Sequence, residues 1–167
     1  MAGMAVRTRE LFQFRGLEAV QNLHPLVVHF PVALLTLATL LYVVAWASKR
    51  DAWAWPALWM LAIGTLAAAV AVWTGLRAGD GVMVAESVRE HILIHHKQVM
   101  IAAFAMSVLL SAWALYAPPM PQRGRLIFLA LAVVMASLIA KGADYGAWMV
   151  YGYNAGGTLP QPIELSQ

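Results

Sequence analysis

Five histidines are the residues of this 167-residue chain with the clearest capacity for chemistry. They form two groups, His24 with His29 and His91 with His95 and His96. Imidazole nitrogen is a good ligand for iron, copper and zinc. His91 and His95 are four residues apart and would share one face of a helix, a spacing that suits direct metal binding. His24 and His29 would be separated by about 140° on an ideal helix, which is poor for holding one ligand together.

The rest of the composition narrows the chemistry. The chain has no cysteine, which excludes disulfides, thiolate ligands, iron–sulfur clusters and covalently attached c-type haem. Only Glu86, Glu90 and Asp144 bring carboxylates near the histidines, so a dinuclear carboxylate site is not expected. A b-type haem needs only two neutral imidazoles from two helices, and helical bundles build such sites from facing side chains.

Four long apolar runs must position these histidines. The chain is 62% apolar and 11% charged, whereas soluble domains carry about 25% charged residues. A chain of this length cannot bury so much apolar surface within its own core. The runs cover about residues 26–47, 57–76, 92–116 and 126–150, and each is long enough to cross a bilayer. They are continuous rather than alternating, so we predict an all-α, integral membrane four-helix bundle.

The bundle is expected to occupy residues 23–157. Residues 1–22 form a polar or amphipathic N-terminal segment, and residues 158–167 form a polar tail. The formal charge of +3 comes from basic residues spread through short segments, which suits topology signals better than nucleic-acid binding.

The basic residues also bear on orientation. The short loops of one side carry Lys49, Arg50, Arg123 and Arg125, and basic residues in short loops favour the cytoplasm for that side. The other side has more basic residues, but they are spread over longer segments. We therefore expect both termini and the histidine face to be periplasmic, in a bacterial inner membrane.

The predicted topology brings all five histidines to one face of the membrane, because the first and third helices run in the same direction. His29 and His96 lie nearly the same number of residues from the far ends of their helices, so they should lie at similar depth. We predict this pair as the ligands of haem b, with His95 as the alternate. His24 and His91 form a shallower tier.

Four basic residues lie at the histidine end and are candidates to bind haem propionates: Arg77, Arg89, Lys97 and Lys141. Lys141 and Asp144 are three residues apart and should pair, which lowers the cost of placing charge near lipid. This pair is also a candidate wall of a quinone site or part of a proton route. Gly142 and Gly146 have GxxxG spacing, which mainly predicts close helix packing.

Two segments resemble a known family. The stretch from Leu23 to Leu34, LHPLVVHFPVAL, resembles the opening signature of the bacterial membrane family called domain of unknown function 2231, and Gly142–Gly157 resembles its closing signature. The resemblance brackets residues 23–157. It implies a four-helix membrane module, found alone or beside c-type cytochrome domains, with haem-linked electron transfer.

The family pattern corresponds directly to His24 and His29 and only loosely to the three later histidines. The closing signature usually has two glycines where Ala147 and Trp148 stand, and a bulky Trp148 would disfavour a cofactor close to the fourth helix.

The expected function is therefore that of a membrane electron-transfer subunit. It would link a periplasmic cytochrome or dehydrogenase to the quinone pool, and it would not be catalytic alone, because the loops are too short for a catalytic domain. Two alternatives remain open at this stage. One is a cofactor-free structural or anchor subunit of a larger membrane complex, and the other is a histidine-bound metal or proton carrier.

Overall fold

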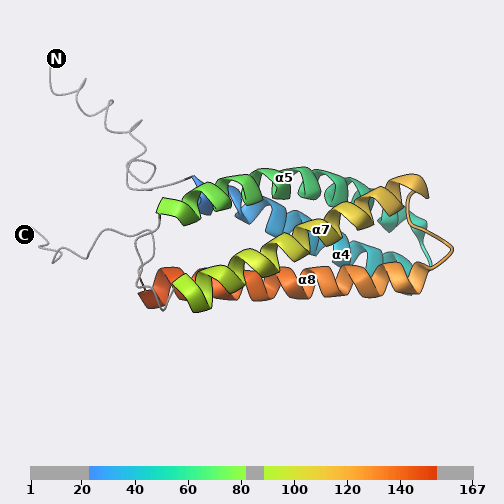
Figure 1. Ribbon diagram of the computed structural model, residues 1–167. Helices are drawn as coiled ribbons and strands as arrows, with labels where there is room; N and C mark the ends of the chain where they lie inside the picture. Colours follow the sequence, from blue (N-terminus) through green and yellow to red (C-terminus); the bar gives the residue numbers. More distant parts are fainter. Residues whose placement is uncertain (1–22, 82–88, 154–167) are drawn as a thin grey trace, which may run out of the picture.

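The structure is a computed structural model that describes residues 23–81 and 89–153, and every regular element in these residues is helical (Figure 1). The predicted N-terminal segment 1–22 and the polar tail 158–167 lie outside the described residues. Four helical segments are long and apolar enough to cross a membrane: His24–Ser48, Asp51–Asp80, Glu90–Tyr116 and Arg125–Gly152. The predicted all-α four-helix membrane bundle is thereby confirmed.

The first span consists of α3 (His24–Val27) and α4 (His29–Ser48), which are separated at Val28. The interruption follows from Pro31, which has no N–H to donate to the carbonyl of Val27 four residues earlier. Pro25 lies in the first turn of α3, where its missing N–H costs nothing.

The second span begins with the 3-10 turn η1 (Asp51–Trp53) and continues as α5 (Ala54–Gly81). It is longer than the predicted 57–76. Pro56 falls in the first turn, where proline is tolerated, so the helix starts before it. At the other end the helix continues past Arg77, so Arg77 and Asp80 project from α5 rather than from a loop.

The third and fourth spans each contain a π-helical turn at the histidine end. The third is η2 (Arg89–Leu93) followed by α7 (Ile94–Tyr116). The fourth is α8 (Arg125–Ala147) followed by η3 (Trp148–Gly152). Such π turns are rare and shift the helical register locally.

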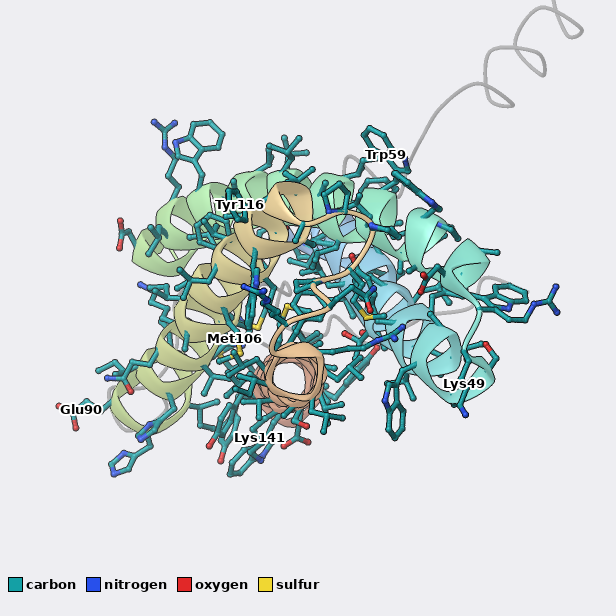
Figure 2. The ribbon with its side chains drawn as sticks, turned by 90° about the vertical axis from the view of Figure 1, so that its right-hand side faces the viewer. Lys49, Trp59, Glu90, Met106, Tyr116 and Lys141 are labelled. Atoms are coloured by element: carbon teal, nitrogen blue, oxygen red, sulfur yellow. The ribbon has the colours of Figure 1, made fainter. Side chains whose placement is uncertain are left out.

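The helices pack in the cyclic order α4, α5, α7, α8. Helices α4 and α7 each pack against both α5 and α8, and they lie diagonally opposite each other. Figure 2 shows the bundle nearly end-on, with Trp59, Tyr116 and Lys141 on its outer surface. Residues on α4 and α7 can therefore meet only across the interior.

The interior is small, and many of the large apolar side chains face outward. Tyr42, Phe128 and Met135 are fully buried, whereas Leu66 is 71% exposed and Leu109 is 70% exposed. Such exposure would be unfavourable in water, but lipid tails are as apolar as leucine. The tryptophans are mostly exposed too, as suits rings that lie near the membrane interfaces. Trp113 is an exception, since it packs edge-on against Phe128 at 5.8 Å between ring centroids.

Hydroxyl groups join α5 to α7 within the apolar interior. The Thr65 hydroxyl lies 2.8 Å from that of Ser111 and 3.3 Å from the carbonyl oxygen of Ser107, and all three residues are buried. Interhelical hydrogen bonds of this kind replace the hydrophobic driving force that helices lack in lipid.

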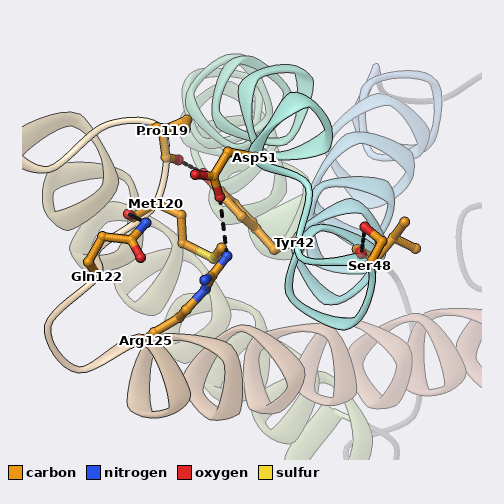
Figure 3. A network of polar contacts seen from close by, with 8 residues as sticks. Tyr42, Ser48, Asp51, Pro119, Met120, Gln122 and Arg125 are labelled. Atoms are coloured by element: carbon orange, nitrogen blue, oxygen red, sulfur yellow. Dashed lines mark hydrogen bonds and ion pairs between the residues drawn. The ribbon is translucent and has the colours of Figure 1, made fainter.

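The loop between α7 and α8 closes the bundle at the end opposite the histidines (Figure 3). Met120 and Pro121 are buried there, and the Tyr42 hydroxyl donates to the carbonyl of Pro119 at 3.3 Å. Arg125 Nη2 donates to Asp51 Oδ1 at 3.3 Å, which ties the start of α8 to η1. Polar contacts with the α4–α5 side thus hold this loop in place.

Candidate cofactor site at the histidine end

Two of the five histidines turn toward neighbouring helices. His24 on α3 and His96 on α7 are half-buried, whereas His29, His91 and His95 are exposed. The reason lies in helical geometry. His29 follows His24 by a rotation of about 140°, and His95 precedes His96 by about 100°, so one member of each pair faces away when the other faces in. The structure does not bring the predicted pair, His29 and His96, together.

His24 packs on α5. Its Nδ1 lies 3.2 Å from the hydroxyl oxygen of Thr74, and that hydroxyl donates its own hydrogen to the carbonyl of Ala71 at 3.0 Å. His24 also forms a hydrogen bond with the backbone of Ala71, so two residues of α5 hold the imidazole. The ring lies against Gly75, where an added Cβ would come within 2.6 Å of the His24 Cε1 atom. The small residue allows the imidazole to lie directly on the backbone of α5.

His96 packs on α8 in a similar way. Its Nδ1 lies 2.8 Å from the carbonyl oxygen of Gly142 and donates to it, because a carbonyl can only accept. An added Cβ at Gly146 would lie 3.5 Å from the His96 Cε1 atom, and one at Gly142 would collide with Met100 Sδ. The predicted GxxxG pair on α8 thus allows α7, which carries His96, to approach closely.

The hydrogen bond to Gly142 determines the protonation of one imidazole. His96 donates from Nδ1, so its neutral ring keeps its lone pair on Nε2, which is a metal-ligating nitrogen. Ligating histidines usually donate their other N–H to a carbonyl or similar acceptor, which fixes the ring. His24 belongs to the first span and His96 to the third, and these two spans lie diagonally opposite each other in the bundle. In the described part of the chain, no group of three or more His, Asp or Glu side chains could hold a metal ion.

The four predicted propionate partners are placed differently. Lys97 is half-buried, packs against Gly79 of α5 and lies 4.0 Å from Asp80. Arg77 lies over the outward-facing ring of Trp73, 4.2 Å from its centroid. Lys141 is exposed, and the side chain of Arg89 lies outside what the structure describes. Among these candidates, Lys97 is therefore the described side chain that is half-buried and lies between α7 and α5.

Trp148 does not fill the space beside His96. It is 52% exposed and its ring centroid lies 5.9 Å from that of Tyr153. The bulky residue that departs from the family pattern therefore lies on the outer surface.

A second group of polar side chains lies on the outer face of the α7–α8 interface. We call His95, Lys141, Asp144 and Tyr145 the outer polar cluster. Lys141 Nζ lies 2.7 Å from Asp144 Oδ2, which confirms the predicted pair, and 4.5 Å from the Tyr145 ring centroid. The His95 ring centroid lies 6.3 Å from that of Tyr145, and His95 Nδ1 donates to the carbonyl of His91 at 2.6 Å.

Sequence reasoning missed the residues that hold His24. Thr74 and Gly75 are two small residues that interrupt an apolar run close to the histidine end. This interruption could have indicated a contact site on α5, but it does not indicate which histidine would lie there.

The fold and the site define a polytopic membrane protein with a pair of inward-turned histidines. The chain belongs to the family described as predicted membrane protein (DUF2231), whose sequence profile matches residues 20–158. The match confirms the resemblance seen in the opening and closing segments. No functionally curated protein and no solved structure shows significant similarity to the chain.

Proposed function

We propose that this protein is a membrane-embedded electron-transfer subunit that binds one haem b through His24 and His96. The observation that carries the proposal is the inward placement of these two half-buried imidazoles, whose Nδ1 atoms form hydrogen bonds with Thr74 and Gly142. His24 takes the place of the predicted ligand His29, because His29 is exposed.

The donor chemistry fits this group. Two neutral imidazoles suit haem iron, and the hydrogen bonds at Nδ1 orient the rings. Gly75 keeps the backbone of α5 close to the His24 ring. Lys97 supplies a positive charge for a propionate. Haem bound in this way supplies one-electron uptake and release.

The proposed partners of this electron transfer are the quinone pool and a periplasmic cytochrome or dehydrogenase. The described loops are short, which supports a role as one subunit of a larger complex rather than as an enzyme acting alone. We place the histidine face and both termini on the periplasmic side of a bacterial inner membrane.

Haem content tests the proposal. The protein is purified in mild detergent from cells supplied with a haem precursor, and extracted haem is quantified as the pyridine complex. We expect about one haem b per chain. Haem near zero in well-folded protein contradicts the proposal. In that case, bound metal found by elemental analysis would favour the metal carrier, and a copurifying membrane partner would favour the anchor subunit.

A further inference from the structure

We propose that the outer polar cluster (His95, Lys141, Asp144 and Tyr145) binds the headgroup of a membrane quinone. This inference deepens the proposed function by assigning the place where a quinone would bind. The redox role of the bound quinone rests on the proposed function, whereas the binding site itself is inferred from the geometry of the cluster.

The cluster faces the lipid side of the bundle. His95, Lys141 and Asp144 are exposed, and Figure 2 shows Lys141 projecting from the outer surface. Charged side chains next to lipid are costly and suggest a function. Tyr145 is half-buried and packs against Ile92, Leu93 and Met149, so the cluster has a fixed aromatic wall.

The charge of the cluster favours an uncharged ligand. Lys141 and Asp144 lie 2.7 Å apart and neutralise each other. An anionic lipid phosphate attracted to Lys141 would also meet the Asp144 carboxylate. The repulsion between these two negative charges would weaken the binding of the phosphate. A quinone headgroup is neutral, flat and polar at two opposite oxygens.

The hydrogen-bonding groups match both forms of such a headgroup. Lys141 Nζ can donate to a quinone carbonyl. The Asp144 carboxylate can accept a hydrogen bond from a quinol hydroxyl. His95 Nε2 can accept one as well, because His95 Nδ1 already carries the ring hydrogen that it donates to the carbonyl of His91. The Tyr145 ring lies beneath Lys141 Nζ and has its centroid 6.3 Å from that of His95, so it offers a fixed aromatic edge beside these polar groups.

The depth of the cluster also suits a lipid-soluble ligand. Helix α8 rises about 24 Å between Arg125 and Lys141 at about 1.5 Å per residue. Lys141 therefore lies near the edge of a hydrocarbon core about 30 Å thick. A headgroup held there keeps its isoprenoid tail in the bilayer.

The cluster adjoins the proposed haem ligand on both helices. His95 precedes His96 on α7, and Lys141 precedes Gly142, whose carbonyl accepts the hydrogen bond from His96. The outer cluster and the inner histidine thus share the same α7–α8 interface, and a quinone bound outside would be close to a cofactor held inside.

Photolabelling tests the site directly. Full-length protein in phosphatidylcholine nanodiscs is illuminated with a short-chain azidobenzoquinone, and the labelled peptides are identified by mass spectrometry. We expect label on the peptides that contain His95 or residues 141–145, and protection by decylubiquinone. Label confined to other helices would overturn the inference.

Matched variants measure the contribution of the polar pair. The double variant Lys141→Met/Asp144→Leu keeps the net charge and removes both hydrogen-bonding groups, so it should weaken decylubiquinone competition by about tenfold, the effect of losing a hydrogen bond or two. Ser137→Ala, an exposed change on the same helix, should leave it unchanged. Equal affinity in the double variant would contradict the assignment, and protection by phosphatidylglycerol but not by decylubiquinone would replace it with a lipid-headgroup site.

The outcomes for haem and quinone are separable. The variant His24→Ala/His96→Ala should lack haem and still be labelled at the outer polar cluster. A wild-type protein that is labelled there but contains no haem would refute the proposed function and leave the quinone site standing. A haem-containing protein labelled elsewhere would refute only the quinone site.

Discussion

His96 donates a hydrogen bond from Nδ1 to the carbonyl of Gly142, 2.8 Å away, and so joins α7 to α8 beside the membrane interface. A Cβ at residue 142 would collide with Met100, so the glycine lets α7 and α8 pack closely at this point. The hydrogen bond also fixes the orientation of the His96 ring. Gly142 therefore serves both the packing of the two helices and the orientation of the imidazole.

Replacing Gly142 with alanine should disturb both functions of this contact. The new Cβ collides with Met100 Sδ, and overpacking of this kind costs about 1–3 kcal/mol. We expect a lower midpoint of thermal unfolding in detergent and less haem per chain. Ala143→Val, an exposed change at the next residue, should have little effect on either. Equal losses in the two variants would show that the Met100 contact is not the cause.

Thr74→Val should weaken haem binding without unfolding the protein. Valine has nearly the same shape as threonine but offers no oxygen to His24 Nδ1. Loss of an outer-shell partner of a metal-ligating histidine typically lowers affinity about 10–100-fold. Haem retention during dilution measures the effect, and Thr36→Val, a lipid-exposed threonine on α4, is the matched control. Full retention in Thr74→Val would remove Thr74 from the proposed site.

The hydroxyl network between α5 and α7 should contribute to stability rather than to cofactor binding. Thr65→Val removes the partner of Ser111 and Ser107, and interhelical hydrogen bonds in membranes are worth about 0.6–2 kcal/mol. We expect this loss in unfolding by denaturing detergent, with haem content per folded chain unchanged. Ser137→Ala serves for comparison, because Ser137 bonds only within its own helix and faces outward. No difference between the two variants would argue against the network.

Tyr42 should stabilise the end of the bundle mainly through its ring. Tyr42→Phe loses the hydrogen bond to Pro119 but keeps the edge-on contact with Phe128 at 5.0 Å, so we expect a cost of about 1 kcal/mol. Tyr42→Ala leaves a cavity and should cost about 3–5 kcal/mol. Equilibrium unfolding of the two variants separates the contributions, and similar losses in both would contradict this division.

The sequence predicted the elements of this fold well, because lipid imposes a simple rule. A continuous apolar run of about 20 residues must be helical, and four such runs lie in the chain. The Lys141–Asp144 pair and the close approach at Gly142 followed from helical spacing alone. The extension of α5 past Arg77 did not, because glycines and charges near a helix end resemble a loop in sequence.

The inward face of each helix was harder to predict. Depth along the helix favoured His29 over His24 in the sequence. The structure instead turns His24 inward, where it contacts Thr74 and Gly75, about fifty positions away in the chain. In lipid the outer face of a helix is apolar too, so hydrophobic periodicity does not reveal which side faces in.

The most direct test of the central claim is the reduced-minus-oxidised absorption spectrum of purified protein and its single-histidine variants. The wild type, His29→Ala and His95→Ala should show the sharp α-band of low-spin haem b. His24→Ala and His96→Ala should each lose it while remaining folded by circular dichroism. A wild-type spectrum without the band, or a band that survives both His24→Ala and His96→Ala, would contradict the assignment of these two histidines as haem ligands.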